Sequence, residues 1–414
     1  MLADRGYDAD FNKEHTTEFY VFSHVVSHQA AAVWAVLVLA RAVGRVASPT
    51  AKYDEEGATM NADPVQSTPK DQASRLLELI AGGWLAQAIF VAAKLGLADQ
   101  VLDRARTAAE LASATGAHPT SLNRVLRLLA SRGIFHLDAD GRYEQTDLSQ
   151  VLCSSAPISL RNFAILNGDK PQWQAWGSLL DSTMTGQSAF ARVHGSGLYD
   201  YLQVHPEDAA VFDAAITDRA RQENAIVCEA YQWAAAGMIV DIGGGQGSLL
   251  TAILENTPDA RGILFEVPRV AEMARQFIEE RGLLSRCDIV AGDAVAFVPA
   301  GADIYLMRRV LHGMSDDRAV RVLQNCCAAM GATGRLLIIE HILAPDNAPS
   351  WGQMLDVQML VLNPGGKERT QHEFEGLLQS AGLAISEIVP TKAVTSLIIA
   401  RKQTAAGVHT SATP

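Results

Sequence analysis

Residues 240–247, VDIGGGQG, decide the fold. They begin within a short apolar run, Met238 to Ile242, and precede Leu249 to Leu254, where apolar residues recur at helical spacing. Glycines let a backbone pass close to a ligand and adopt positive φ angles. The stretch therefore predicts a buried strand, a loop that contacts a ligand and a helix, in that order.

The alternation of strands and helices continues toward the C-terminus. Further short apolar runs predict strands at Ile263–Phe265, Ile289–Val290, Ile304–Met307 and Leu336–Ile339. Helical segments separate these runs, which predicts an α/β fold with a doubly wound, Rossmann-like parallel sheet. No helix separates Ile385–Val389 from Val394–Ala400, so the sheet is expected to end in an antiparallel hairpin.

The glycine loop differs from a dinucleotide-binding loop, because neither register completes the pattern G-x-G-x-x-G. Instead, Asp241 stands two residues before the alternating series Gly243, Gly245 and Gly247. A carboxylate at this position suits a ligand with a cationic amino acid end and no pyrophosphate. S-adenosylmethionine is such a ligand.

Two more acids follow the next two predicted strands. Glu266 ends the second strand, where an acid can bind both hydroxyls of a ribose. Asp293 follows the third strand, where a carboxylate can accept a hydrogen bond from the adenine amino group. Because these acids occur in order at the ligand edge of the sheet, the sequence predicts S-adenosylmethionine as the cofactor.

Composition excludes several classes of protein. The 414 residues are 48% hydrophobic and 19% charged, which suits two or three domains with large cores and excludes disorder as the main state. A net charge of −12 argues against binding to nucleic acid or anionic lipid through a global positive field. The five cysteines show no metal-ligand spacing, and their odd number suits a reducing compartment. We expect a cytoplasmic protein with no metal, nucleic-acid or membrane partner.

The two ends of the chain carry no functional prediction. Residues 1–70 are interpreted as an N-terminal extension followed by a linker, which the composition of Lys52 to Lys70 indicates. Within the extension, the apolar run Ala30–Ala40 is too short to span a bilayer and is interpreted as a packed or amphipathic helix. Residues 404–414 are small and polar, so we expect a disordered tail.

The stretch from Leu76 to Tyr143 follows the pattern of a winged-helix module. Thr107 and Glu110 form a predicted capping box at a helix start, and Pro119 opens a second amphipathic helix. Gly133 ends that helix, and residues 134–143 predict a hairpin. Such a module binds DNA or packs on a twin copy or the next domain. The acidic chain and the absence of a basic wing favour packing.

Five stretches resemble the caffeic-acid-type (plant-like) O-methyltransferases and their bacterial natural-product relatives: VDIGGGQG at 240–247, FEVPRV at 265–270, AGD at 291–293, LHGMSDD at 311–317 and NPGGKERTQHEFEGL at 363–377. The resemblance implies a class I methyltransferase fold. It also implies a mainly helical winged-helix domain at residues 71–235, which dimerises and lines the substrate pocket, and a catalytic, S-adenosylmethionine-binding domain at residues 236–403. The expected assembly is a homodimer.

The chemistry of methyl transfer to a phenol calls for a base. A phenol has a pKa near 10, whereas a histidine has a pKa near 6.5 and is mostly a free base at neutral pH. The resemblance assigns this role to His312, with Glu340 and Glu368 as the carboxylates that flank it. His341 is a competing candidate, but strand alternation directs it to the opposite face.

Further roles follow from the resemblance alone. Arg308 stands where the family often has a lysine near the carboxylate of the cofactor. Asn167, Trp176, Met359 and Asn363 match or fall near positions that line the acceptor pocket.

The chain departs from the family pattern at two places beside the proposed base. His312 is followed by Gly313 and Met314 in place of Asp and Trp, and Arg309 replaces another common tryptophan. These departures concern how the acceptor is placed and how the cofactor packs.

The leading hypothesis is an enzyme that methylates a hydroxyl of an aromatic small molecule, a secondary metabolite, with S-adenosylmethionine as the donor. One alternative keeps the cofactor and changes the reaction to hydroxylation or decarboxylation. A second alternative is a winged-helix regulator whose catalytic domain senses a ligand. Relatives with other reactions lack the histidine, so His312 favours methyl transfer.

Overall fold

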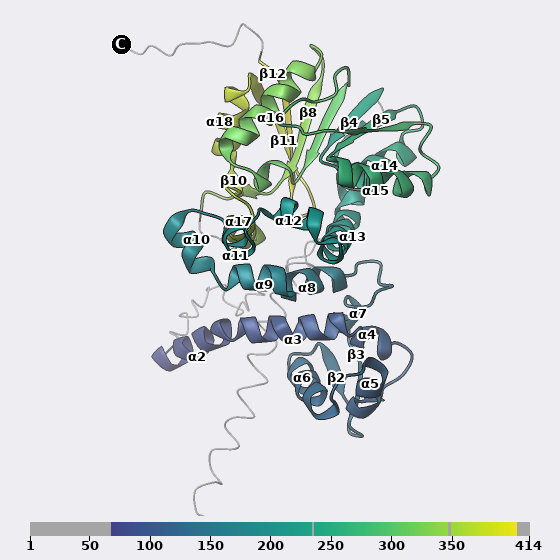
Figure 1. Cartoon of the computed structure of the whole chain (residues 1–414), viewed down its shortest axis with the longest axis vertical. Helices are drawn as coiled ribbons and strands as arrows, with labels where there is room; N and C mark the ends of the chain where they lie inside the picture. The colour runs from purple at the N-terminus through teal and green to yellow at the C-terminus, as the bar shows by residue number, and fades with distance from the viewer. Residues whose placement is uncertain (1–67, 234–235, 347–348, 404–414) are drawn as a thin grey trace, which may run out of the picture. The chain divides into compact units, whose positions relative to one another are not determined.

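The computed structural model describes residues 68–233, 236–346 and 349–403 (Figure 1). The predictions for the extension, the run Ala30–Ala40 and the tail lie outside the described residues. The described chain divides into two compact units, one of residues 68–88 and 97–150 and the other of residues 89–96 and 151–403. The helices that follow residue 151 thus belong to the same unit as the sheet. The domain boundary expected at residue 235 stays a prediction.

The first unit has the predicted helix, helix and hairpin order. Its elements are α2 (Pro69–Ile80), the first half of α3 (Gly82–Lys94), α4 (Leu97–Gln100), β1 (Arg106–Thr107), α5 (Ala108–Thr115), α6 (Pro119–Ser131), β2 (Phe135–Leu137), β3 (Arg142–Gln145) and α7 (Asp147–Gln150). The Thr107–Glu110 capping box forms, and β2 and β3 pair antiparallel. β1 adds a third strand to this hairpin, which the sequence pattern did not indicate.

Helix α2 begins at Pro69, before the expected end of the linker at Lys70. The Thr68 hydroxyl accepts from the backbone N–H of Asp71 at 3.2 Å, and the Asp71 carboxylate accepts from the backbone N–H of Thr68 at 2.9 Å. This reciprocal pair satisfies two donors that the first turn of a helix leaves free. Because the stretch before Lys70 is polar, its composition indicated a linker and not the start of a helix.

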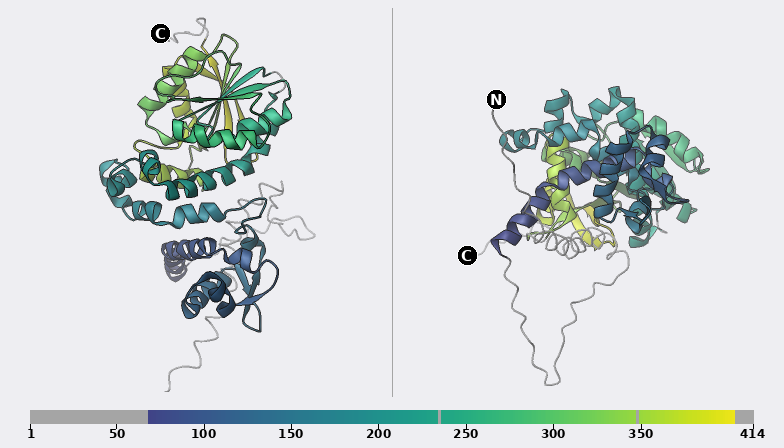
Figure 2. Two further views of the ribbon diagram at one scale, coloured as in Figure 1. Left: turned by 45° about the vertical axis from the view of Figure 1, so that its right-hand side comes forward. Right: turned by 90° about the horizontal axis from the view of Figure 1, so that it is seen from below.

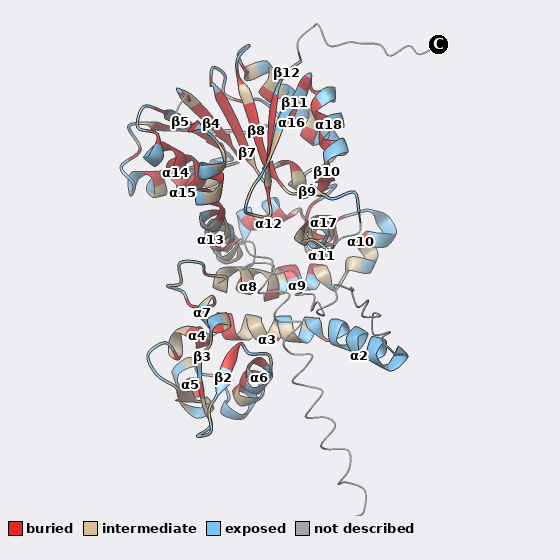
Figure 3. Ribbon diagram, turned by 180° about the vertical axis from the view of Figure 1, so that it is seen from behind, coloured by how far each residue is buried: buried red, intermediate tan, exposed pale blue. Residues whose placement is uncertain are grey.

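Helix α2 presents a large apolar surface to solvent. Leu76, Leu77, Leu79 and Ile80 are 58–69% exposed, as is Trp84 at the start of α3 at 73%, and Figure 3 shows α2 as an exposed helix. By length and composition alone, the run Pro69–Lys94 is the one segment of the described residues that is apolar enough to cross a membrane. Helices that pack on protein have the same length and composition.

The second unit is built on a seven-stranded sheet. Its strands are β4 (Met238–Ile242), β5 (Arg261–Glu266), β6 (Cys287–Ala291), β7 (Ile304–Arg308), β8 (Arg335–Glu340), β11 (Leu383–Pro390) and β12 (Ser396–Lys402), in the order β11-β12-β8-β7-β4-β5-β6. β4 to β8 run parallel, and β12 is antiparallel to both β8 and β11. The predicted doubly wound sheet with a terminal hairpin is confirmed (Figure 2).

Each face of the sheet is covered by helices, so alternate strand residues enter two separate cores. One core combines Val240, Tyr305 and Ile338 with residues of α16 (Asp316–Ala329) and α18 (Gln371–Ser380). The other combines Ile239 and Leu306 with residues of α14 (Ser248–Asn256) and α15 (Pro268–Glu279). Burial on both faces explains why the strands are continuous apolar runs rather than alternating ones.

A layer of helices lies beyond the carboxyl edge of the sheet (Figure 1). It consists of α8 (Arg161–Gly168), α9 (Lys170–Trp176), α10 (Leu179–Thr185), α11 (Ala189–His194), α12 (Leu198–Val204), α13 (Pro206–Ala230) and α17 (Trp351–Leu362). Within this layer, α17 packs on α9 and α11, since Val361 and Leu362 share a core with Ala175 and Phe190. The mainly helical character expected of residues 71–235 thus holds for the described residues of this layer.

Candidate active site

Three chain segments converge at the carboxyl edge of the sheet. His312 lies in the 3-10 turn Leu311–Gly313, which follows β7, and Glu340 is the last residue of β8. β7 and β8 are parallel neighbours, so their carboxyl ends meet. Glu368 directly precedes β10 (Arg369–Thr370), which pairs parallel with β9 (Ile342–Leu343) just beyond Glu340. This short pair brings Glu368 to the other two side chains.

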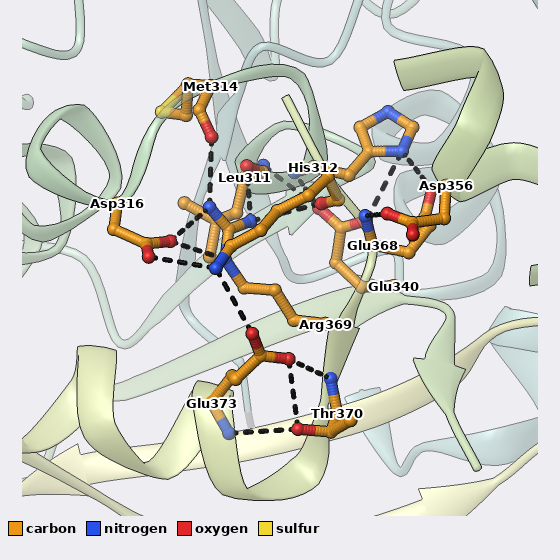
Figure 4. Close-up of polar contacts among 11 residues, drawn as sticks. Leu311, His312, Met314, Asp316, Glu340, Asp356, Glu368, Arg369, Thr370 and Glu373 are labelled. Carbon is orange, nitrogen blue, oxygen red and sulfur yellow. Dashed lines mark hydrogen bonds and ion pairs between the residues drawn. The ribbon is translucent and has the colours of Figure 1, made fainter. Parts of the chain in front are cut away.

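The histidine ring contacts one carboxylate directly (Figure 4). His312 Nδ1 lies 2.8 Å from Glu368 Oε1 and 3.9 Å from Glu340 Oε2. Glu340 Oε1 accepts hydrogen bonds from the backbone N–H groups of Leu311, at 2.9 Å, and His312, at 3.3 Å. The two acids therefore act on different parts of the histidine: Glu368 orients the ring and Glu340 holds the turn.

The surroundings of His312 shift its pKa. Burial of the ring lowers the pKa, but the charge of Glu340 and the hydrogen bond to Glu368 outweigh burial, so the pKa is raised above its usual value. A carboxylate only accepts hydrogen bonds, so Glu368 places the proton of the neutral ring on Nδ1. Nε2 is then the free base.

The same three side chains are the one His/Cys/Asp/Glu group among the described residues with metal-ligand spacing, with ligand atoms within 4.8 Å of one another. Glu368 and one oxygen of Glu340 already bind protein donors. The other oxygen of Glu340, Oε2, has no hydrogen-bond partner among the described residues, and the expectation of no metal stays a prediction.

A buried arginine that the sequence reasoning missed holds the histidine turn from its other side. The guanidinium of Arg369, which is fully buried, donates to the carbonyls of Leu311 at 2.8 Å and Met314 at 2.9 Å, and to Asp316 Oδ1 at 2.8 Å (Figure 4). Glu340 binds the N–H groups of this turn and Arg369 binds its carbonyls, so both sides are fixed. Arg369 lies within the quoted stretch NPGGKERT, directly after Glu368.

Replacing Arg369 by methionine should destabilise the fold. The buried carbonyl of Leu311 and the partly buried carbonyl of Met314 lose their donor, and an unsatisfied buried polar group costs about 1–3 kcal/mol. We expect the free energy of unfolding, measured by urea titration, to fall by about 2–4 kcal/mol. Each of the two carbonyls contributes to this loss, and relaxation of the turn offsets part of it. Arg318→Met, at an exposed position of α16, is the matched control. Equal stability of both variants would show that the clamp contributes nothing.

The glycine loop has the backbone that the sequence predicted. Gly243, Gly245 and Gly247 have φ angles of 67°, 62° and 82°, in the left-handed region where glycine is favoured. A Cβ on Gly245 would meet nothing within 4 Å, which leaves open space beside the loop. Glu266 Oε1 accepts from the N–H of Gly245 at 3.0 Å, so the acid predicted to bind ribose also fixes the loop.

Asp241 is a buried acid at this edge of the sheet. The residue is 1% exposed, and neither carboxylate oxygen has a hydrogen-bond partner among the described residues. Burial is the main cause that raises the pKa of Asp241 to about 7. A buried carboxylate without partners is costly, so its presence at the glycine loop fits a ligand that supplies donors.

Gly244 is a second position that the sequence reasoning missed. A Cβ on Gly244 would lie 2.3 Å from Asp241 Oδ2 and 2.8 Å from Leu264 Cδ1. Gly244→Ala should therefore push the Asp241 side chain from its place at an overpacking cost of about 1–3 kcal/mol. We expect weaker S-adenosylmethionine binding in calorimetric titration, whereas Gly331→Ala, where a Cβ has open space, should bind as the native chain does.

Asp293 and Arg308, the other residues predicted to bind the cofactor, form hydrogen bonds with groups of the protein. Asp293 is exposed, and its Oδ1 accepts from the N–H of Val295 at 2.9 Å. Arg308 donates to Asn224 Oδ1 at 2.6 Å and to Ser248 Oγ at 3.3 Å, which ties β7 to α13 and to the start of α14.

The four predicted acceptor-lining residues lie on three helices of the layer. Asn167 on α8 donates to the carbonyl of Phe163 at 2.8 Å, and Trp176 on α9 donates to Gln358 Oε1 at 2.5 Å. Met359 and Asn363, at the end of α17, are nearly buried and contact each other at 3.4 Å. α17 thus links three of the four positions.

The departures from the family pattern also have structural partners. Arg309 has a φ of 55°, which is uncommon for a residue with a side chain, and its guanidinium binds the buried carboxylate of Glu223 on α13. Gly313 lies beside Tyr199, whose hydroxyl would be 3.8 Å from a Cβ at that position, an ordinary van der Waals contact. His341 Nδ1 donates to the carbonyl of Val394 at 2.6 Å, and the ring packs on Gly352 rather than on His312.

The chain resembles known proteins over most of its length. An O-methyltransferase domain matches residues 176–384, and an O-methyltransferase dimerisation domain matches residues 77–155. Phenazine O-methyltransferase PhzM of Lysobacter antibioticus is 41% identical over 329 residues, which cover 80% of this chain and 96% of that protein.

Solved structures give the same result. The crystal structure of LaPhzM is 41% identical with a TM-score of 0.77, and the match covers 80% of this chain and 99% of that one. The O-methyltransferase NcsB1 from neocarzinostatin biosynthesis, solved with S-adenosylmethionine and 2-hydroxy-5-methyl naphthoic acid, is 33% identical with a TM-score of 0.69, and the match covers 77% of this chain and 96% of that one.

The fold and the site define a Rossmann-like class I methyltransferase preceded by a dimerisation domain. The chain belongs to the O-methyltransferase family, in the branch of bacterial natural-product enzymes. It is an enzyme that acts as an O-methyltransferase, and its cofactor is S-adenosylmethionine. These conclusions confirm the predicted family, fold, activity and cofactor.

Proposed function

We propose that this enzyme methylates a hydroxyl group of an aromatic small molecule, with His312 as the general base. The observation that carries the proposal is the 2.8 Å contact between His312 Nδ1 and Glu368, which leaves Nε2 free at the carboxyl edge of the sheet. The relatives support an aromatic acceptor, since one is named for a phenazine and another was solved with a naphthoic acid.

The glycine-loop edge would hold the cofactor. Asp241, the alternating glycines, Glu266, Asp293 and Arg308 are the residues we assign to it. Bound S-adenosylmethionine supplies a methyl group on a positively charged sulfur. The orphaned carboxylate of Asp241 and the open space at Gly245 support this assignment.

The residues of the chain then act on the acceptor. Nε2 of His312 takes the proton of the attacking hydroxyl, and Glu368 stabilises the imidazolium that results. Glu340 and Arg369 fix the turn that carries the ring, so that the base keeps its position. Asn167, Trp176, Met359 and Asn363 are the residues we assign to the acceptor wall.

The enzyme is proposed to work as a homodimer in the cytoplasm. The matched dimerisation domain, residues 77–155, includes the exposed Leu77, Leu79 and Ile80 of α2, which a second copy would cover. Leu79→Arg should therefore shift the protein from dimer to monomer in light scattering. Leu180→Arg, at an equally exposed leucine of α10, should leave the dimer intact, and a monomeric native protein would contradict the proposal.

The test of the function is an assay with S-adenosylmethionine and a panel of hydroxylated aromatic compounds, with mass spectrometry of the products. We expect the gain of one methyl on an oxygen. A cofactor-bound enzyme that consumes oxygen or releases carbon dioxide with these compounds, without methylated product, would favour the hydroxylase or decarboxylase alternative.

A further inference from the structure

An arginine in the helical layer lies against two aromatic rings. Arg219 is in the middle of α13, and its Cζ lies 5.0 Å from the centre of the Phe163 ring and 5.8 Å from that of Trp351. Phe163 belongs to α8 and Trp351 begins α17, and their ring centres are 6.4 Å apart. Three helices of the layer thus bring two rings to one guanidinium, a favourable arrangement for a cation.

The positive charge of Arg219 is not matched by an acid. Among the described residues, no Asp or Glu oxygen lies within 4.0 Å of its guanidinium, and the nearby carboxylate of Glu223 binds Arg309 instead. Burial, and after it the charge of Arg309, lower the pKa of Arg219 to about 10, while Glu223 opposes them. Arg219 therefore remains cationic at neutral pH without an ion-pair partner.

The two rings that contact Arg219 belong to the same helices as residues that we assign to the acceptor wall. Asn167, which we assign to the acceptor wall, follows Phe163 by one helical turn and donates to its carbonyl. Met359 and Asn363, also assigned to that wall, share α17 with Trp351. Arg309, the neighbouring arginine, stands three residues before His312.

We propose that Arg219 binds a carboxylate on the acceptor, so that the preferred substrates are hydroxylated aromatic carboxylic acids. This inference rests on the proposed function. A guanidinium presents paired N–H donors that match the two oxygens of a carboxylate. Arg309 is less suited to this role because its guanidinium already binds Glu223. Phe163 and Trp351 would face the aromatic ring of the same acceptor.

The first test compares acids with neutral acceptors of the same shape. Hydroxynaphthoic acids and the corresponding hydroxynaphthamides are assayed with native enzyme, Arg219→Gln, Arg219→Lys and Arg221→Gln, and kcat/KM is measured for each. We expect the native enzyme to prefer each acid by about tenfold or more, as a charge-assisted pair predicts. Arg219→Gln should lose this preference and Arg219→Lys should regain part of it. Arg221, exposed on the same helix, should be replaceable without effect.

A binding measurement separates this inference from the proposed function. Titration of the S-adenosylhomocysteine complex with 2-naphthoate, which has no hydroxyl to methylate, should show binding that Arg219→Gln weakens by about tenfold or more. Methylation of naphthamides as efficient as that of the acids, or naphthoate binding unchanged in Arg219→Gln, would overturn the inference alone. Failure of the native enzyme to methylate any hydroxyarene while naphthoate still binds through Arg219 would overturn only the proposed reaction.

Discussion

Replacing His312 by alanine is expected to lower kcat for methyl transfer by about 10²- to 10⁴-fold, the range that a general base contributes. The variant keeps the glycine loop and its acids, none of which contacts the His312 ring in the described structure. S-adenosylmethionine affinity should therefore equal that of the native enzyme. Steady-state kinetics with a phenolic acceptor and calorimetric titration with the cofactor measure the two quantities.

His372→Ala is the matched control for this variant. Its side chain is 96% exposed on α18, and its loss should change neither kcat nor affinity. If His312→Ala lost cofactor binding along with turnover, His312 would have a structural role rather than the role of a base. Retention of full activity would transfer the role to another group, with His341 the first to examine.

Glu368→Gln is expected to have the second largest effect, about a 10²-fold loss of kcat, below the roughly 10⁴-fold that an acid-to-amide change costs in a Ser-His-Asp triad. The amide keeps the size of the side chain but removes the charge that stabilises the imidazolium. It also lets the side chain donate to the ring, which favours the wrong tautomer.

The same variant should change the pH profile in a defined direction. A base acts in its neutral form, so activity falls as pH drops through the pKa of His312. Although burial opposes it, Glu340 and Glu368 together raise that pKa, so the acidic limb of kcat/KM should lie above the ordinary value of about 6.5. Glu368→Gln should move the limb to lower pH, whereas Glu375→Gln on α18 should not. A limb that stays in place would show that Glu368 does not act on the base.

The parallel strands were predictable because burial on both faces makes each of them a continuous apolar run. The capping box at Thr107 and the turn glycines were likewise visible, since their roles depend on a few adjacent residues. The capping box at Thr68 follows the same rule, but it lies in a polar stretch whose composition suggested a linker.

The site was predictable only in part. His312, Glu340 and Glu368 lie far apart in the sequence, and the structure joins them through a two-residue strand pair that has no pattern of its own. Arg369 and Gly244 have roles that depend on atoms distant in sequence, the carbonyls of the His312 turn and the carboxylate of Asp241. Arg219 depends on three helices that meet only after folding.

The central claim is that His312 presents a free Nε2 because Glu368 holds the proton on Nδ1. Nitrogen NMR of the ¹⁵N-histidine-labelled enzyme in its S-adenosylhomocysteine complex, titrated with pH and assigned with His312→Ala, measures this directly. We predict a neutral ring protonated on Nδ1 and a pKa above the ordinary value of about 6.5. A neutral ring protonated on Nε2, or a pKa below that value, would contradict the account.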